Sequence, residues 1–122
     1  MRELVSHKVN GLNEALKILV VDEPGQGGAC HQYRIEYAPN GDACNAQEVK
    51  FQNGPILEFG VNGISGEALL AIVEDRLLSF QAGPFACREN AVALTKIQEA
   101  MMWLQKRTLD RMRRGVEGTN VK

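Results

Sequence analysis

Three arginines near the end of the sequence have the spacing needed to bind one anion together. Arg107, Arg111 and Arg114 follow at intervals of four and three, so on a helix they share one face. Guanidinium groups suit bidentate phosphate recognition. Trp103, one turn before Arg107, offers an aromatic surface for a base or for the guanidinium. This spacing favours a phosphate site; the alternative is a solvated helix end, where each cation complements the helix dipole by ~0.3–1 kcal/mol.

A second group of residues with chemical potential lies upstream, at positions 80–90. Phe80 and Phe85 flank a Gly-Pro break, and Arg88 and Asn90 follow it. A base stacked on an exposed phenylalanine, with an amide reading its edge, is a common nucleotide-binding arrangement. The pattern alone favours the other interpretation, in which both phenylalanines close the end of a helical hairpin.

The third candidate is the run Arg-Arg-Gly-Val-Glu-Gly-Thr-Asn at residues 113–120. Gly115 is well placed to end a helix, which leaves a second glycine unexplained. Gly118 and Thr119 would expose backbone amides and a hydroxyl, groups that bind phosphate oxygens in a nest. The alternative is a flexible tail.

Other chemistry finds little support in the sequence. The glycine-rich loop at residues 25–28 lacks the phosphate-loop pattern, and His7 and His31 have no partner at a metal-ligand spacing. Cys87 is explained as a small buried side chain. We therefore predict no catalytic residue, no metal site and no cofactor.

The composition sets the scale of the molecule. The chain has 122 residues, 14 Lys and Arg against 15 Asp and Glu, and a net charge of −1, so we expect a single domain and no nucleic-acid polymer as partner. No apolar run is long enough to span a bilayer, and we recognise no signal peptide, so we expect no membrane association and no secretion. The three cysteines form no CxxC pair, which favours reduced thiols in a cytoplasmic protein.

The first half of the chain is predicted to form a sheet. Residues 15–21 and 31–37 are expected strands of a hairpin around the glycine-rich loop, followed by a turn at 39–42. We further expect strands at 49–52 and 56–61, separated by Asn-Gly-Pro, and an edge strand within residues 4–12.

Helical periodicity begins after residue 64. Ser65 is the expected N-cap of a helix that ends before Gly83, and a longer helix runs from Arg88 or Glu89 to Gly115. We predict an α+β fold, an N-terminal antiparallel β-sheet (residues 1–62) followed by a C-terminal two-helix hairpin (residues 65–119). The seam of the longer helix comprises Leu94, Ile97, Met101, Leu104 and Thr108.

Residues 65–119 resemble the helical hairpin of phage anti-defence sponges. The resemblance includes the Phe-Gln-Ala-Gly-Pro-Phe segment and the Arg-Gly-Val-Glu-Gly-Thr run. The sequence is most similar to the Thoeris anti-defence sponges, which share this hairpin with the smaller anti-CBASS sponges. The β-rich first half favours the longer, Thoeris type. One departure is Asn120-Val121-Lys122, where a histidine more usually follows the threonine.

The resemblance implies a protein that binds and sequesters cyclic nucleotide immune messengers without cleaving them. Members of this family bind glyco-cyclic ADP-ribose isomers, and some hold cyclic trinucleotides at a separate site. They assemble as homodimers or as hexamers built from dimers. A phage- or prophage-encoded protein of this kind is expected in the cytoplasm of the infected bacterial host, where it would block Thoeris and CBASS effectors.

The resemblance also implies roles for residues at matching positions. Phe80 would stack on adenine, Asn90 would hydrogen-bond the ligand, and Arg107 and Arg111 would neutralise its phosphates, with Arg88 in a lesser role. The trinucleotide site would lie at a subunit junction and comprise Arg114, Gly115, Val116, Glu117, Gly118 and Thr119.

Affinity sets a lower limit on ligand size. A sponge that outcompetes a receptor needs nanomolar binding, about −12 kcal/mol. At ~0.3 kcal/mol per heavy atom this corresponds to roughly 40 atoms, the size of a dinucleotide. Because 122 residues are few for a deep cleft around such a ligand, we expect pockets shared between subunits. Two alternatives remain: an enzyme that cleaves such messengers, and an adaptor whose helical hairpin mediates assembly.

Overall fold

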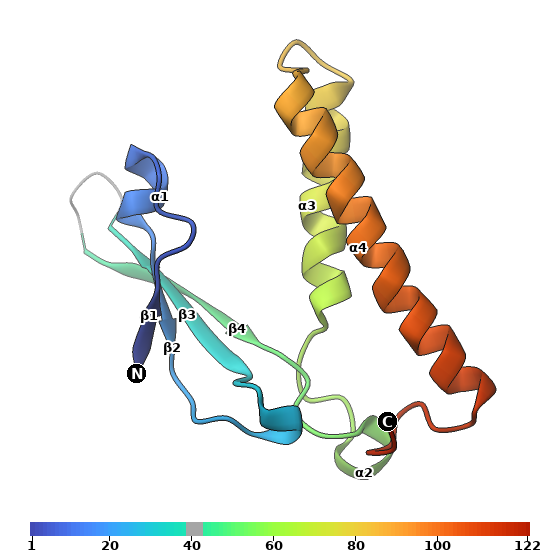
Figure 1. Cartoon of the computed structure of the whole chain (residues 1–122). Helices are drawn as coiled ribbons and strands as arrows, with labels where there is room; N and C mark the ends of the chain where they lie inside the picture. Colours follow the sequence, from blue (N-terminus) through green and yellow to red (C-terminus); the bar gives the residue numbers. More distant parts are fainter. Residues whose placement is uncertain (39–42) are drawn as a thin grey trace. The chain divides into compact units, whose positions relative to one another are not determined.

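The structure is a computed structural model that describes residues 1–38 and 43–122 (Figure 1). The turn predicted at 39–42 lies outside the described residues. The chain divides into two compact units, a sheet unit of residues 1–54 and 59–64 and a hairpin unit of residues 55–58 and 65–122. The predicted α+β order, an antiparallel sheet followed by a helical hairpin, is confirmed.

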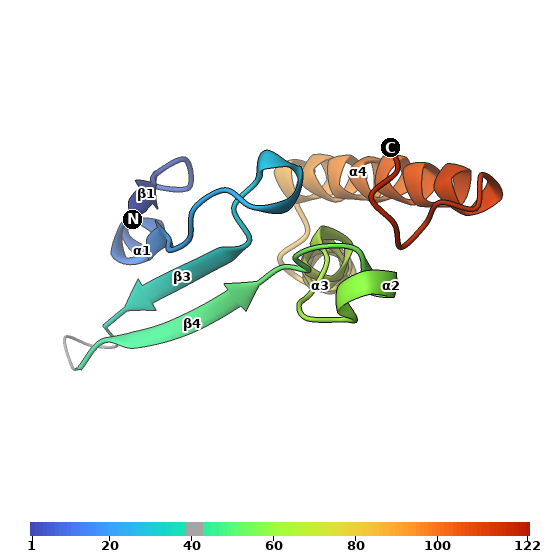
Figure 2. The same ribbon diagram turned by 90° about the horizontal axis from the view of Figure 1, so that it is seen from below.

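Four antiparallel strands form the sheet in the order β1-β2-β3-β4. Their bounds are β1 Arg2–Leu4, β2 Lys17–Val20, β3 Gln32–Tyr37 and β4 Asn45–Lys50. Strands β3 and β4 run alongside each other over their full length, which Figure 2 shows from below. Strands β2 and β3 also pair antiparallel, so the hairpin predicted from residues 15–21 and 31–37 is confirmed.

One face of the sheet carries its apolar side chains. Val20 pairs with Tyr33, which pairs in turn with Val49, and Val20 is only 1% exposed. Tyr33 also meets Phe51 edge to face, with ring centroids 5.7 Å apart. Because side chains alternate along a strand, Arg34 lies on the opposite face, where it pairs with carboxylates of neighbouring residues.

The predicted edge strand at residues 4–12 is wrong in its bounds. The edge strand β1 ends at Leu4, and residues Gly11–Ala15 form the short helix α1. Asn10 starts this helix, because its side-chain oxygen accepts a hydrogen bond from the backbone N–H of Asn13 at 3.2 Å. Local capping therefore outweighs the apolar pattern here.

The predicted strand at residues 56–61 is also wrong. Residues Ile56–Phe59 form the short helix α2, and Gly54 before it has φ of +88°. The Gln52 amide donates to the carbonyl oxygens of Gly54 at 3.1 Å and Gly60 at 2.8 Å. These bonds draw the two ends of the segment together, so the chain forms a closed loop instead of a hairpin.

The glycine-rich loop connects β2 to β3, as predicted. It contains the 3₁₀ turn η1, Gln26–Gly28, in which Gly27 has φ of +73°. The Asp22 carboxylate closes the loop by accepting hydrogen bonds from the backbone N–H groups of His31 at 2.9 Å and Gln32 at 3.2 Å. The hydrogen bond from His31 lowers the pKa of Asp22.

Two helices, α3 Gly66–Gln81 and α4 Arg88–Arg113, pack side by side in the hairpin unit (Figure 1). Ser65 caps α3 as predicted, accepting from the Ala68 N–H at 3.1 Å. Gly115, with φ of +70°, follows the end of α4, also as predicted. No helix among the described residues is long and apolar enough to cross a membrane.

Candidate functional site

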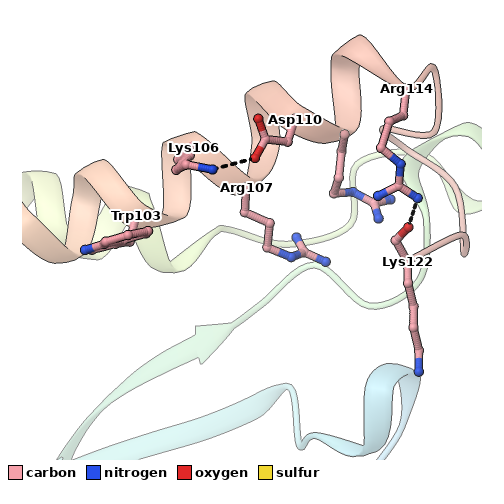
Figure 3. A pocket seen from close by; sticks show the side chains of 7 residues that line it. Trp103, Lys106, Arg107, Asp110, Arg114 and Lys122 are labelled. Carbon is pink, nitrogen blue, oxygen red and sulfur yellow. Dashed lines mark hydrogen bonds and ion pairs between the residues drawn. The ribbon is translucent and has the colours of Figure 1, made fainter.

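An open cavity of about 340 Å³ lies along the C-terminal half of α4 (Figure 3). Its lining combines one indole, five basic side chains and one carboxylate. Six of these residues come from α4 and its cap, and the seventh follows them in the chain. The lining residues are Trp103, Lys106, Arg107, Asp110, Arg111, Arg114 and Lys122. The structure thus brings together Trp103 and the three arginines that the helical spacing placed on one face.

Trp103 and Arg107 are exposed lining residues of this cavity. Trp103 is 70% exposed, so its ring is accessible to a planar ligand. Arg107 is exposed, and within residues 1–38 and 43–122 its guanidinium has no hydrogen bond or ion pair. Figure 3 shows it between Trp103 and Arg114. A guanidinium of this kind retains all its donors for an anion.

Asp110 supplies the negative charge of the lining. Its carboxylate accepts from Lys106 Nζ at 2.9 Å, one turn earlier on α4 (Figure 3), and from Arg113 at 3.4 Å. The hydrogen bond from Lys106 lowers the pKa of Asp110, and the charges of Arg113 and Arg114 act in the same direction. Asp110 is therefore a weak base that stays ionised near neutral pH.

Arg111 has different surroundings from Arg107, although it lies only one turn further along α4. It is 7% exposed. Its Nε donates to Glu117 Oε2 at 3.0 Å, and its terminal nitrogens donate to the carbonyl oxygens of Val116 at 2.9 Å, Thr119 at 3.1 Å and Val121. Arg111 therefore contributes positive charge to the cavity while its donors contact residues 116–121.

Residues 115–121, which we call the tail, fold back against α4. Gly115 and Gly118 have positive φ values of 70° and 82°. The Thr119 hydroxyl donates to the Val116 carbonyl oxygen and accepts from the Val121 N–H at 3.2 Å. The Gly118 carbonyl oxygen accepts from the Leu57 N–H of α2 at 3.2 Å. The tail is thus an ordered turn with its own hydrogen bonds.

The second predicted group lies where α3 ends and α4 begins. Phe80 is 36% exposed and has the Arg76 guanidinium 5.3 Å from its ring centroid. Phe85 is 73% exposed, so it does not close the end of the hairpin. The Gln81 side chain accepts from the Cys87 N–H at 3.1 Å and thereby holds the connecting loop.

The N-terminus of α4 corrects the interpretation of Cys87. This residue is exposed, not buried, and its Sγ accepts from the Asn90 N–H at 3.4 Å as the N-cap of α4. Arg88 is exposed beside it, and the Asn90 side chain is half-buried. An open cavity of about 380 Å³ lined by Arg88, Glu89, Val92 and Ala93 lies at the same end of the helix.

The predicted residues therefore form two groups that the hairpin holds apart. Asn90 and Arg107 are both on α4, and 17 positions separate them. At a rise of 1.5 Å per residue this corresponds to about 25 Å along the helix axis. A compact cyclic dinucleotide cannot span that length, so one copy of the chain does not bring Phe80 and Asn90 to Arg107.

Three residues of these groups were not predicted from the sequence. Arg76 lies four residues before Phe80 and Lys106 four residues before Asp110, spacings that place each pair on one helical face. These contacts were therefore detectable in advance. Lys122 lines the cavity only because the tail folds back, and no local signal predicts that. Within the described part of the chain, no group of three metal-ligating side chains occurs.

The helical hairpin thus carries, on its longer helix, an arginine-rich cavity beside an indole, a lining whose chemistry suits an anion. Comparison with known proteins identifies the family. Residues 45–109 match the family model described as Acb2/Tad1, hairpin domain. These residues make up more than half of the chain, which therefore belongs to the Acb2/Tad1 hairpin family, and the resemblance noted in the sequence is confirmed.

A comparison with a single relative agrees with this family. The chain is 57% identical over 74 residues to a protein of Bacillus phage SBSphiJ7 named Thoeris anti-defense 1. The alignment covers 61% of this chain and 52% of that protein. The chain thus spans about half the length of this relative.

Proposed function

We propose that this protein is a phage anti-defence sponge, which binds and sequesters cyclic nucleotide immune messengers without cleaving them. The observation that carries the proposal is the cavity on α4, in which five basic side chains surround one carboxylate beside an exposed indole. Membership of the Acb2/Tad1 hairpin family supports it. We expect the protein to act in the cytoplasm of the infected host, where such messengers are made.

The charge of the cavity favours a ligand with at least two phosphates. Arg107 is exposed and Arg114, also exposed, donates to the Lys122 carbonyl oxygen, so we assign direct phosphate contact to Arg107, and the buried Arg111 adds positive charge. Trp103 would pack against a ribose or a base. Glyco-cyclic ADP-ribose isomers have the required pyrophosphate between two riboses.

The second group supplies recognition of a base. Phe80 would stack on adenine with one face of its ring. The guanidinium of Arg76, on the same helix, lies over the Phe80 ring. The Asn90 amide would hydrogen-bond the edge of the ligand, and Arg88 would assist with charge. These residues lie about 25 Å along α4 from Arg107, so we propose that a complete pocket takes the two groups from different copies in a homodimer or hexamer.

Exposed apolar side chains on α4 fit such an assembly. Met102, Leu109 and Met112 are 67%, 50% and 58% exposed. They follow one another at intervals of seven and three residues, so they lie along one side of the helix. Covering this stripe with a second copy would remove apolar surface from water. This also favours the adaptor alternative, for which assembly would be the whole function.

A second site for cyclic trinucleotides would lie at the tail. Arg114 supplies charge, and the positive φ values of Gly115 and Gly118 allow the amides of the intervening residues to converge. The amides of Gly115, Val116 and Thr119 donate within the chain, whereas those of Glu117 and Gly118 make no hydrogen bond with the described residues. Glu117 is exposed, so its amide could hold a phosphate oxygen, whereas Gly118 is buried against α2. The Thr119 hydroxyl contacts the tail itself and shapes this turn.

The chemistry of the cavity favours binding over cleavage. A general base works best with a pKa near the working pH. The carboxylate in the described lining belongs to Asp110, whose pKa is lowered by Lys106, and the other polar side chains are hydrogen-bond donors. These groups would stabilise bound phosphates in the ground state without activating a nucleophile.

Native mass spectrometry with a panel of messengers tests the proposal. We expect bound glyco-cyclic ADP-ribose at a whole number of ligands per dimer, at nanomolar protein concentrations. Linear products would favour the cleaving enzyme. An assembly that binds none of the cyclic ADP-ribose isomers or cyclic trinucleotides would favour the adaptor.

A further inference from the structure

The buried guanidinium of Arg111 suggests a role different from that of Arg107. We infer that Arg111 is a positioning residue, which folds the tail against α4 and so builds one wall of the cavity for the messenger. The inference rests on the proposed function for the identity of the ligand. It divides the arginine face into one residue that contacts phosphate and one that organises the residues around it.

The hydrogen bonds of Arg111 carry this inference. A guanidinium has five N–H donors, and four contacts of Arg111 go to the tail: the Glu117 carboxylate and three carbonyl oxygens. The residue is 7% exposed. The four contacts compensate a buried charge, and removing them is strongly unfavourable, so they hold the tail to α4.

The tail has a second anchor, on α2. Gly118 contacts α2, whose Leu57 N–H donates to its carbonyl oxygen at 3.2 Å. A Cβ at Gly118 would lie 3.0 Å from Leu57 Cγ and 3.1 Å from Ile56 Cγ1, and its φ of +82° disfavours other residues. The tail is therefore held between the Arg111 guanidinium and α2.

The folded tail determines where two further cations lie. Arg114 donates to the Lys122 carbonyl oxygen, and both residues line the cavity with Arg107 (Figure 3). Lys122 follows the tail directly, so it reaches the cavity only while the tail is folded back. Arg111 thus affects messenger binding through Lys122 and Arg114.

Glu117 distinguishes a positioning role from direct phosphate binding. If Arg111 contacted phosphate directly, its bond to Glu117 would compete with the ligand, and Glu117→Gln would strengthen binding. If Arg111 holds the tail, Glu117→Gln weakens that hold, and messenger binding weakens with it. Direct phosphate binding by Arg111 thus predicts tighter messenger binding in Glu117→Gln, and a positioning role predicts weaker binding. The substitution removes the same negative charge near the cavity in both cases.

The experiment combines calorimetry with hydrogen exchange of the full chain. The probes are glyco-cyclic ADP-ribose and cyclic tri-AMP, and the variants are Glu117→Gln and Arg111→Lys. We expect Glu117→Gln to weaken binding at least threefold and Arg111→Lys at least tenfold, because lysine keeps the charge but loses the fork that reaches several carbonyls. Amides of residues 116–121 should exchange at least tenfold faster, while those of residues 95–105 stay protected. Arg113→Lys, at a 77% exposed side chain, is the matched control.

Tighter binding by Glu117→Gln, or unchanged tail exchange in Arg111→Lys, would overturn the inference. If Arg111→Lys does not fold, Gly118→Ala replaces it, because this substitution loosens the tail where it contacts α2. We expect Gly118→Ala to lower messenger affinity in the same way. A mobile tail with unchanged affinity in Gly118→Ala would contradict the inference. Failure of the wild-type protein to bind either probe would instead refute the proposed function. Tail exchange in the Arg111→Lys and Glu117→Gln variants would then decide the role of Arg111 by itself.

Discussion

At the scale of single residues, position on one helical face does not determine what an arginine can do. Arg107 and Arg111 are one turn apart, yet Arg107 is exposed and Arg111 is 7% exposed with its donors directed at the tail. We therefore propose Arg107 for direct contact with phosphate. We propose Phe80, with a third of its surface exposed, for the matching contact with the base.

Loss of either contact should reduce messenger affinity without unfolding the chain. We expect Arg107→Ala and Phe80→Ala each to raise the Kd for glyco-cyclic ADP-ribose at least tenfold in calorimetry, with unchanged circular dichroism. Lys96→Ala is the control, because Lys96 is a 69% exposed cation of the same helix that pairs with Glu99. Unchanged affinity in both variants would disprove the site assignment.

Asp110 should oppose the binding of an anion, because it places a carboxylate in the cavity. We expect Asp110→Asn to tighten messenger binding about threefold at low salt, with a smaller gain at 0.5 M salt, since salt screens exposed charges. Glu99→Gln, which neutralises an acid elsewhere on α4, should have no such effect.

The pH dependence of that gain checks the protonation state of Asp110. Lys106 lowers the pKa of Asp110 below its ordinary value of about 3.9, so the carboxylate is ionised at pH 5.5 and at pH 8 alike. The gain should therefore be equal at both values. The stabilising contact with Lys106 is present above the unfolded pKa and is lost as the pH falls through the lower, folded one. A gain that disappears at pH 5.5 would contradict this assignment.

The sequence predicts part of this residue-scale description. The spacing of Trp103, Arg107 and Arg111 was sufficient to predict a shared face, and the cavity contains all three. The burial of Arg111 was not predictable, because it depends on carbonyl oxygens up to ten residues away that come together only when the tail folds.

At the scale of elements, two helix ends were predicted correctly from local signals, whereas the caps at Asn10 and Cys87 were not predicted. Ser65 and Gly115 have local signals that read directly from the sequence, and both act as expected. The helix α2 was missed, because Ile56–Phe59 has the apolar and aromatic residues of a strand. Contacts of the Gln52 side chain across the loop decide its structure, and such contacts have no short-range pattern.

The N-cap of α4 offers a direct test at this scale. Cys87 Sγ accepts the Asn90 N–H at 3.4 Å, and a hydroxyl is a stronger acceptor than a thiol. We expect Cys87→Ser to raise the free energy of unfolding by about 0.5–1 kcal/mol in denaturant titrations. Cys44→Ser, at another exposed cysteine that caps no helix, should leave it unchanged. A destabilised Cys87→Ser variant would contradict the capping geometry.

At the scale of the whole molecule, the net charge of −1 conceals a strongly cationic cavity, because acids elsewhere in the chain offset its five basic residues. The chain also separates its two groups of candidate binding residues by about 25 Å along α4. Both features follow from a long helix that carries different chemistry at its two ends. They support our proposal that a second copy completes the pocket.

Mixing of two defective variants tests this shared pocket. Phe80→Ala and Arg107→Ala proteins should each bind messenger poorly alone. Combined after mild unfolding and refolding, they form mixed dimers in which one pocket receives an intact Phe80 from one copy and an intact Arg107 from the other. We expect mixed dimers to recover one high-affinity site each, measured by native mass spectrometry. Mixed dimers without any recovered site would show that the pocket does not combine these residues from two copies.

We propose above all that the protein sequesters a messenger without cleaving it. Incubation with glyco-cyclic ADP-ribose, followed by heat denaturation and chromatography of the released nucleotide, measures this directly. The account predicts that the ligand disappears from solution while the protein is folded and is recovered intact, in stoichiometric amount, after heating. Recovery of linear ADP-ribose products, or a ligand that never leaves solution, would contradict it.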